Sequence, residues 1–160
     1  MRGKSPKILF VLQKSQKGKE KMSVITKHLK FATQGHTDII DITEKVAQCV
    51  EESKLRQGIV TVFVSGATGG ITTVEYEPGL VKDLKVTFER IASEKIEYAH
   101  NLRWGDGNGY SHVRASLLGP SLTIPFVKGS LQLGTWQQII FIDFDNRPRN
   151  RELVVQIMGE

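Results

Sequence analysis

The last forty residues alternate short β-prone segments with tight turns, and this pattern constrains the fold more than any other feature of the chain. Segments 121–127, 136–144 and 152–158 are rich in β-branched and aromatic residues. The turns 128–130 and 146–150 separate them. Connections this short join antiparallel strands, because parallel strands need a long crossover. The C-terminal part of the chain therefore predicts an antiparallel sheet.

Three further segments upstream are also typical of strands. Residues 24–31 and 37–42 mix apolar and polar side chains in short runs. Residues 58–64 form a continuous run of β-branched and aromatic residues, which predicts a strand buried on both faces.

Three helices are predicted between these strands. The first is capped by Asp41 or Thr43 and buries Cys49 on its apolar face. The second begins at Pro78, and the third begins at a Ser111 cap, which places His112 in its first turn. Since the helices do not alternate strictly with the strands, the pattern favours a single α+β domain.

Positive charge is concentrated at the N-terminus. The net charge is +5, but residues 1–22 carry seven of the lysines and arginines against one glutamate, which leaves residues 23–160 at −1. We expect a flexible basic extension over 1–22 and one domain over 23–160. Because the domain has no excess of positive charge, nucleic acid is not expected as a partner. The apolar run 7–13 is too short to cross a membrane, and a single cysteine excludes an internal disulfide, so a cytoplasmic protein is expected.

His100 and His112 flank a loop, 101–109, that is rich in glycine and polar residues. Imidazole groups can bind a metal or move protons near neutral pH, and such loops often carry functional sites. The alternative is that both histidines are ordinary hydrogen-bonded surface groups.

Glu75 and Glu77 form a second candidate cluster. Residues two apart on an extended segment point to the same side, so both carboxylates could meet one cation. Alternatively, Glu77 caps the helix that begins at Pro78.

Phosphate binding is a possible role for two other segments. The glycine-rich segment 65–70 could cradle phosphate with its backbone amides, or it could be a simple turn. Arg147, Arg149 and Arg151 follow Asp143 and Asp145, and guanidinium groups suit phosphate oxygens. The alternative for these arginines is a solvated turn.

Four blocks of sequence, 107–119, 121–125, 133–137 and 144–157, resemble the YjbQ-like family, whose members are often described as secondary thiamine-phosphate synthases. The resemblance runs from about Val24 to the C-terminus. It implies a compact α+β fold with a strongly curved, largely antiparallel sheet, and a homotrimer with sites near the subunit boundaries. It also implies an activity that joins a pyrimidine diphosphate to a thiazole phosphate with release of pyrophosphate. The alternative is a non-catalytic protein that binds a metal or a phosphorylated metabolite at a degenerate site.

The resemblance also assigns roles to individual residues, and a divalent metal such as Mg²⁺ is expected with them. The implied catalytic residues are His100, Asn108 and His112; the implied ligand-binding residues are Thr68, Trp136 and Gln137; the implied metal ligands are Glu75, His100 and His112. The charge of a departing diphosphate adds Arg147, Arg149 and Arg151 as ligand-binding candidates, and Glu77 is a further candidate metal ligand. Trp136 would stack on a flat ring, unless it is a core residue. The chain departs from the family pattern at Gly66, where many members carry a histidine, and at Val74, Tyr110 and Asp143.

Overall fold

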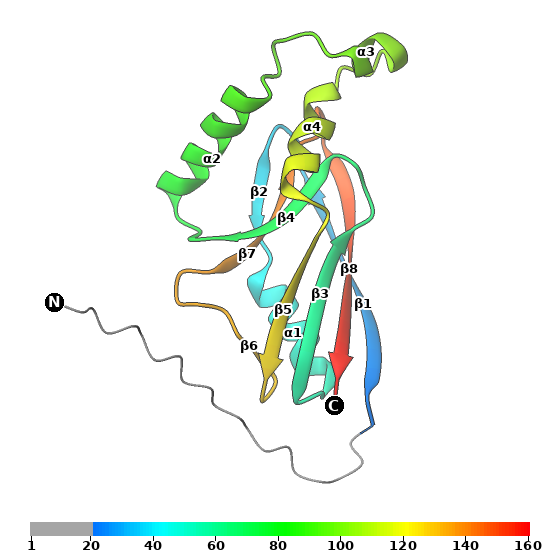
Figure 1. Ribbon diagram of the computed structural model, residues 1–160, viewed down its shortest axis with the longest axis vertical. Helices are drawn as coiled ribbons and strands as arrows, with labels where there is room; N and C mark the ends of the chain where they lie inside the picture. Colours follow the sequence, from blue (N-terminus) through cyan, green and yellow to red (C-terminus); the bar gives the residue numbers. More distant parts are fainter. Residues whose placement is uncertain (1–20) are drawn as a thin grey trace, which may run out of the picture.

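The computed structural model describes residues 21–160, so the expected basic extension lies almost wholly outside the described residues. Figure 1 shows their arrangement. The strands are β1 (Ser23–Thr33), β2 (Asp38–Asp41), β3 (Gln57–Val64), β4 (Gly69–Val74), β5 (Ser121–Val127), β6 (Ser130–Leu131), β7 (Gln138–Asp143) and β8 (Arg149–Gly159). The helices are α1 (Thr43–Ser53), α2 (Pro78–Ile91), α3 (Ala99–Trp104) and α4 (Gly109–Leu118). Within residues 21–160, none of these helices is long and apolar enough to span a bilayer.

Hydrogen bonding divides the strands into two sheets, and every strand pair is antiparallel. The larger sheet has the order β1-β8-β3-β5-β6, and the smaller has the order β2-β7-β4. The C-terminal strand β8 thus lies between β1 and β3, far from its neighbours in sequence. The expected α+β fold with a curved, largely antiparallel sheet is confirmed.

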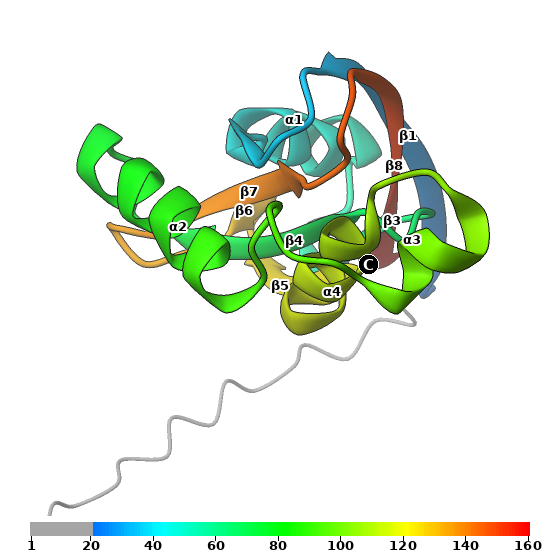
Figure 2. The ribbon, with the colours of Figure 1, turned by 90° about the horizontal axis from the view of Figure 1, so that it is seen from above.

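Two apolar clusters fill the layers. The first lies between the inner face of the larger sheet, α1 and one face of the smaller sheet, and it includes Cys49, as predicted. The second lies on the opposite face of the smaller sheet, under α2 and α4 (Figure 2). Strand β7 belongs to both, because Ile139 and Phe141 enter the first cluster while Ile140 and Ile142 enter the second.

Three local predictions are wrong. Strand β3 is buried on one face only: Ile59 and Phe63 point outward and are 40% and 41% exposed. The segment predicted as a loop between the two histidines contains the short helix α3, which a six-residue stretch without apolar periodicity does not signal. Helix α4 begins at Gly109, and its N-cap residue is Asn108, three residues before the predicted Ser111 cap.

Candidate functional site

His100 and His112 lie against each other at the end of the molecule formed by α3 and α4 (Figure 1). Their ring centroids are 4.4 Å apart, and the ring planes meet at 43°. His100 lies in α3 and His112 lies in the first part of α4, so the two short helices bring the side chains together across the loop. The structure thus joins the two histidines that the sequence singles out.

Asn108 and Asp106 complete the surroundings of His100. Asp106 Oδ2 lies 3.5 Å from His100 Nε2. With the Asn108 amide nitrogen turned toward these groups, it lies 3.2 Å from His100 Nε2 and 3.1 Å from Asp106 Oδ1. In this orientation the NH₂ group of Asn108 faces the carboxylate of Asp106, which can only accept hydrogen bonds. In the opposite orientation the amide oxygen of Asn108 would face that carboxylate, and no hydrogen bond could form. In this orientation the Asn108 amide nitrogen lies between His100 Nε2 and the Asp106 carboxylate and positions both groups.

The pKa of His112 is lowered from its ordinary value of 6.5. Burial is the largest cause, and the neighbouring His100 lowers the pKa further. The carboxylates of Asp106 and Asp145 oppose these effects without overcoming them. His112 is therefore neutral at pH 7 and is able to accept a proton or a hydrogen bond.

His112 opens onto a cleft of about 390 Å³ between α4 and the glycine-rich segment that follows β3. The remaining lining residues all have small side chains or none: Gly66, Ala67, Gly69, Ala115, Ser116 and Pro120. A methyl group added at Gly66 would lie 3.4 Å from Arg151 Nη1. A larger side chain at this position would therefore meet the guanidinium group at the edge of the cleft.

Two glycines at the start of β4 allow close packing on either side of the strand, Gly70 against α4 and Gly69 against β7. A methyl group at Gly70 would lie 2.6 Å from Leu118 Cδ2, and one at Gly69 would lie 2.7 Å from the Phe141 ring. Both distances are below van der Waals contact, so any larger residue would push the helix or the ring away. Of the three glycines in segment 65–70, which the sequence predicts to be a turn or a phosphate cradle, Gly70 thus allows the contact with α4 and Gly69 makes room for the Phe141 ring of β7.

A buried cluster of charges lies beneath this end of the molecule. Asp143 and Asp145 are fully buried. Arg151 makes a bidentate contact with Asp143, from Nε to Oδ2 at 2.6 Å and from Nη2 to Oδ1 at 2.5 Å. Arg149 Nε donates to Asp145 Oδ2 at 2.8 Å. Thr68 Oγ1 donates to Asp145 Oδ2 at 3.0 Å and accepts from Arg151 Nη2 at 2.9 Å.

The cluster changes the roles expected for the predicted phosphate-binding residues. Arg149, Arg151 and Thr68 already have charged or polar partners within the protein. Arg147 is exposed and forms no ion pair with any residue in the described part of the chain. It lines a second cleft, of about 360 Å³, together with Asp106, Asn108, Asn146 and Arg149. Arg147 is therefore the arginine best placed to meet an anionic ligand.

Arg114 anchors α4 from its other side. It is 1% exposed and donates to Ala92 O at 2.9 Å, to Thr37 Oγ1 at 2.8 Å and to Glu89 Oε2 at 2.7 Å. Its guanidinium also lies 4.8 Å from the ring centroid of Tyr110. Burial raises the pKa of Tyr110 to about 12. Tyr110, where the family pattern has an aspartate, therefore faces this anchor rather than the histidine pair.

Four predicted site residues lie at the opposite end of β4 and β7. Glu75 directly follows β4, six residues beyond Gly69, which is about 20 Å along an extended strand. Glu77 caps α2 by accepting hydrogen bonds from Gly79 N at 2.6 Å and from Leu80 N, so the capping alternative describes its position. Trp136 is 68% exposed, so the alternative that it is a core residue is wrong.

Gln137 lies in the same loop as Trp136 and holds that loop together. Its Oε1 accepts from Gly134 N at 2.8 Å, and its Nε2 lies 3.4 Å from Thr73 Oγ1. Within one chain, the structure therefore does not bring Glu75, Trp136 or Gln137 to the histidine pair.

The residues of one chain do not fit a divalent metal. Among residues 21–160, no three histidine, cysteine, aspartate or glutamate side chains converge as a metal site would require. Glu77 uses its carboxylate as a helix cap, and the two histidine rings are packed against each other. We therefore derive no chemical step through a metal.

Asp106 is the residue at this site that the sequence did not single out. It comes from the glycine-rich loop and lies beside His100, while Asn146 Nδ2 donates to its backbone carbonyl at 2.7 Å. The sequence could have indicated Asp106, because it is a carboxylate in the glycine-rich loop between the two histidines and such loops often carry functional groups.

The fold and the site define a class of small α+β proteins built on two antiparallel sheets, with a histidine pair and polar clefts at one end. The chain belongs to the family described as UPF0047 protein YjbQ-like, which matches residues 27–160. A UPF0047 protein from Methanothermobacter thermautotrophicus is 40% identical over 139 residues, which cover 87% of this chain and 95% of that protein. UPF0047 protein YugU from Bacillus subtilis is 33% identical over 135 residues, covering 83% and 98% of the two chains.

Solved structures agree with this assignment. The crystal structure of a YbjQ-like protein of unknown function from Sulfolobus solfataricus has a TM-score of 0.83 at 32% identity and covers 88% of this chain and 100% of that one. A hypothetical protein from Aeropyrum pernix has a TM-score of 0.79 at 29% identity, with 85% and 99% covered.

Proposed function

We propose that the protein is a transferase of the thiamine-phosphate synthase type, which joins a pyrimidine diphosphate to a thiazole phosphate and releases pyrophosphate. The observation that carries this proposal is the contact between the tilted rings of His100 and His112, beside Asn108 and next to a cleft that Arg147 lines. A neutral imidazole, a small-residue cleft and an exposed guanidinium group suit a ligand with a flat ring and an anionic tail.

In the proposed reaction, bonds break and form only within the two substrates, and no covalent bond to the protein is needed. The bond between the pyrimidine methylene carbon and the diphosphate oxygen breaks, and the electron pair leaves with the diphosphate. The thiazole nitrogen then attacks the carbon with its lone pair and loses no proton, because it carries none. Catalysis therefore consists of stabilising the departing charge, for which Arg147 is placed, and of holding the two rings together beside His112.

The His112→Ala variant is expected to lower kcat by about 100-fold or more, because the group that contacts the ring or the leaving phosphate is lost. The measurement is pyrophosphate release and product formation from the two precursors by the purified full chain, in the presence of Mg²⁺. Lys85→Ala, on the exposed side of α2, is the control and retains full activity. The proposal fails if the wild-type protein does not turn over the two precursors, or if folded His112→Ala is fully active.

A second candidate is a protein that binds a metal or a phosphorylated metabolite at the same site without turnover. Gly66 favours it, because this position contributes no side chain to the cleft beside His112. Thermal unfolding in inorganic phosphate, in pyrophosphate and in divalent metal salts distinguishes the two functions. A binder without activity shows a Tm that rises with ligand concentration by mass action and no turnover. The same titration tests the expected Mg²⁺ or other divalent metal.

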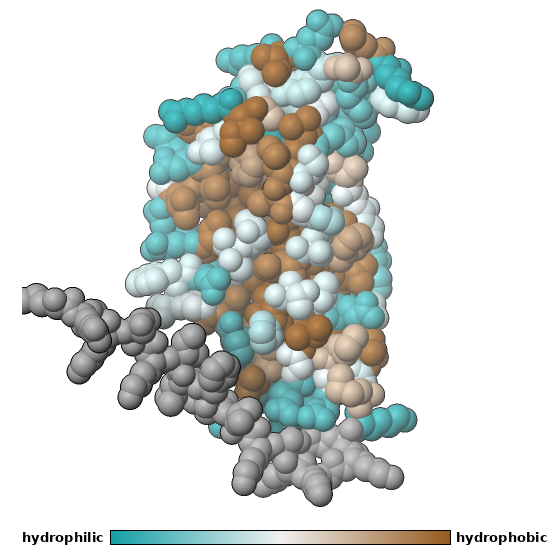
Figure 3. Space-filling view, in the orientation of Figure 1, coloured by the Kyte–Doolittle hydropathy of each residue, from teal (hydrophilic) through white to brown (hydrophobic). Residues whose placement is uncertain are grey.

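We also propose that the protein acts as a homotrimer. In the lower half of Figure 1, no helix of the described chain lies in front of β3, β5 and β8, and Figure 3 shows apolar side chains on this outer face of the larger sheet. The strand register aligns the exposed side chains of Val24, Met158 and Ile59 in one row across this face. A second copy packed there would bury this row. Since Glu75 and Trp136 lie far from the histidine pair of their own chain, a site that contains all of them must draw some from a second copy.

The Phe63→Glu variant is expected to convert the trimer to a monomer, because Phe63 lies on the same outer face and a charge there would be buried in the contact. Light scattering after size-exclusion chromatography measures the mass. Val86→Glu is a matched control, since Val86 is 40% exposed on α2 and Phe63 is 41% exposed. A monomeric wild-type protein, or a variant with the mass of the wild type, contradicts the proposal.

A further inference from the structure

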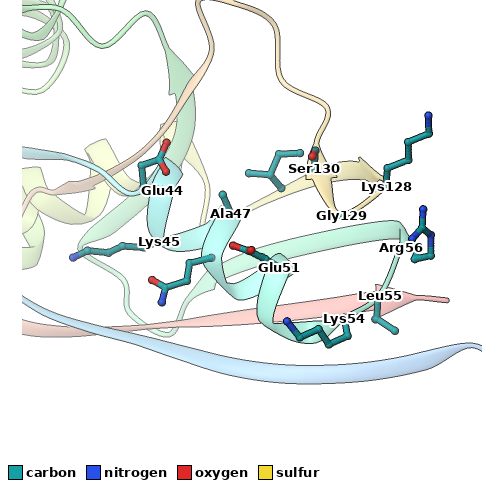
Figure 4. A pocket seen from close by; sticks show the side chains of 12 residues that line it. Glu44, Lys45, Ala47, Glu51, Lys54, Leu55, Arg56, Lys128, Gly129 and Ser130 are labelled. Carbon is teal, nitrogen blue, oxygen red and sulfur yellow. The ribbon is translucent and has the colours of Figure 1, made fainter.

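A groove of about 690 Å³ lies between α1 and the β5–β6 hairpin, at the end of the molecule opposite to the histidine pair (Figure 4). Leu55 and Leu131 line it, and both are half-buried and packed against the first apolar cluster. The volume falls within the range of small-molecule sites, which combine an apolar lining with a few polar groups. None of the residues assigned to the candidate site lies in this groove.

Three cations from neighbouring segments form the rim of the groove. Lys54 and Arg56 follow α1, and Lys128 lies at the tip of the hairpin. Gly129 N donates to Arg56 O at 2.9 Å, which ties the hairpin tip to the segment after α1. Figure 4 shows the side chains of Lys128 and Arg56 side by side at one end.

The charge balance of the groove is positive. Lys54, Arg56 and Lys128 form no ion pair with any side chain of residues 21–160. With Lys45 added, the lining holds four cations against the acids Glu44 and Glu51. The groove therefore favours an anion, while its two acids disfavour a long polyanion such as nucleic acid.

The backbone gives a second, independent reason to assign a function to these lysines. Lys54 has a φ of 63° at the C-cap of α1, and Lys128 has a φ of 54° in the two-residue hairpin turn. Glycine or asparagine is the favoured residue at both kinds of position, because an L side chain is strained in the left-handed region. Residues held in such conformations concentrate at functional sites. Of the four non-glycine residues with positive φ among residues 21–160, two are these lysines, and both line the same groove; the other two, His36 and Thr37, lie between β1 and β2.

We infer that the groove between α1 and the β5–β6 hairpin is a second binding site, for a small molecule that carries a phosphate group on an apolar ring or chain. The Arg56 and Lys128 side chains would bind the phosphate oxygens, Lys54 would add positive charge at the other edge of the groove, and Leu55 and Leu131 would contact the apolar part. The site is separate from the histidine pair, so this inference does not depend on the transferase activity.

Phenyl phosphate is a suitable probe, because it joins one phosphate to one apolar ring. Titrated into the ¹⁵N-labelled full chain, it is expected to shift the amide signals of Leu55, Arg56, Lys128 and Gly129 saturably, with a Kd of about 1 mM or below. Inorganic phosphate and phenol are each expected to bind more weakly, because phosphate lacks the apolar ring and phenol lacks the phosphate group.

Lys54→Asn and Lys128→Asn are each expected to weaken phenyl phosphate binding at least several-fold while leaving Tm unchanged or raising it. Asparagine removes the charge but accepts the left-handed backbone more readily than lysine does. A merely structural role for the lysines would not produce weaker binding together with retained stability.

Two variants serve as controls. Lys85→Asn removes a lysine outside the groove, and His112→Ala alters the other site, so in both variants phenyl phosphate shifts the groove amides as it does in the wild type. The inference is overturned if the groove amides show no saturable shift up to about 20 mM probe. It is also overturned if Lys54→Asn and Lys128→Asn both bind the probe as the wild type does.

Discussion

Asp143→Ala is expected to lower the free energy of unfolding by about 3–5 kcal/mol. Asp143 is fully buried and bound by both nitrogens of the Arg151 fork, and Thr33 Oγ1 donates to it at 2.5 Å. Without this carboxylate, the Arg151 guanidinium stays largely buried with only Asp145 Oδ2, 3.5 Å away, as a counter-charge. Chemical denaturation at pH 7 measures the loss.

Glu152→Ala is the matched control, in which an exposed acid on β8, the strand that carries Arg151, is removed. Glu152 pairs with Lys30 and His28 at the surface, with about half of its side chain exposed, so its removal is expected to cost less than about 1 kcal/mol. A loss in Asp143→Ala no larger than in this control would contradict the prediction.

The effect of Asp143 also has a defined pH dependence. Burial by itself would raise the pKa of Asp143, but its bonds to Arg151, Thr33 and the Asp145 amide outweigh burial and hold the pKa below the ordinary value of 3.8. The stabilisation is therefore complete above pH 3.8 and is lost as the pH falls through the folded-state pKa. The difference between wild type and Asp143→Ala should shrink only in that acidic range.

Arg114→Ala is expected to lower the free energy of unfolding by about 3 kcal/mol or more. The substitution leaves a cavity and removes the hydrogen-bond partner of the buried Ala92 carbonyl and Thr37 hydroxyl. It also releases Tyr110, whose buried hydroxyl already has no hydrogen-bond partner among the described residues. Because Arg114 and His112 share α4, the NMR signals of the His112 ring are expected to move as well.

Arg103→Ala is the control for Arg114→Ala. Arg103 lies on the exposed side of α3 with its guanidinium near the Trp104 ring, so its removal should change stability by no more than about 0.5 kcal/mol. Equal effects of the two substitutions would show that the buried contacts of Arg114 contribute nothing measurable.

Local sequence patterns predicted most of the strands and three of the helices, because periodicity and turn residues act over short distances. They could not place β8 between β1 and β3, since these pairings join residues that lie far apart in the sequence, such as Val60 with Ile157 and Val24 with Met158. The exposure of Ile59 and Phe63 was missed for the same reason: an apolar run does not reveal which face another layer covers.

The candidate site shows the same division between local and long-range information. The sequence singled out His100 and His112, but their contact depends on the short helix α3. The rule that residues two apart share a side holds within a strand, and β4 ends at Val74, just before Glu75. Arg149 and Arg151 of β8 point inward because they pair with the buried Asp145 and Asp143. The number of charges in the sequence does not reveal this pairing.

The position of β7 has a consequence for how the protein unfolds. This strand contributes alternate side chains to both apolar clusters and pairs with β2 on one edge and β4 on the other. We expect neither apolar cluster to unfold while the other stays folded, because both clusters lose packed side chains when β7 separates from the sheet. The domain is therefore expected to unfold as one cooperative unit, and a destabilising substitution near the histidine pair lowers the stability of both clusters.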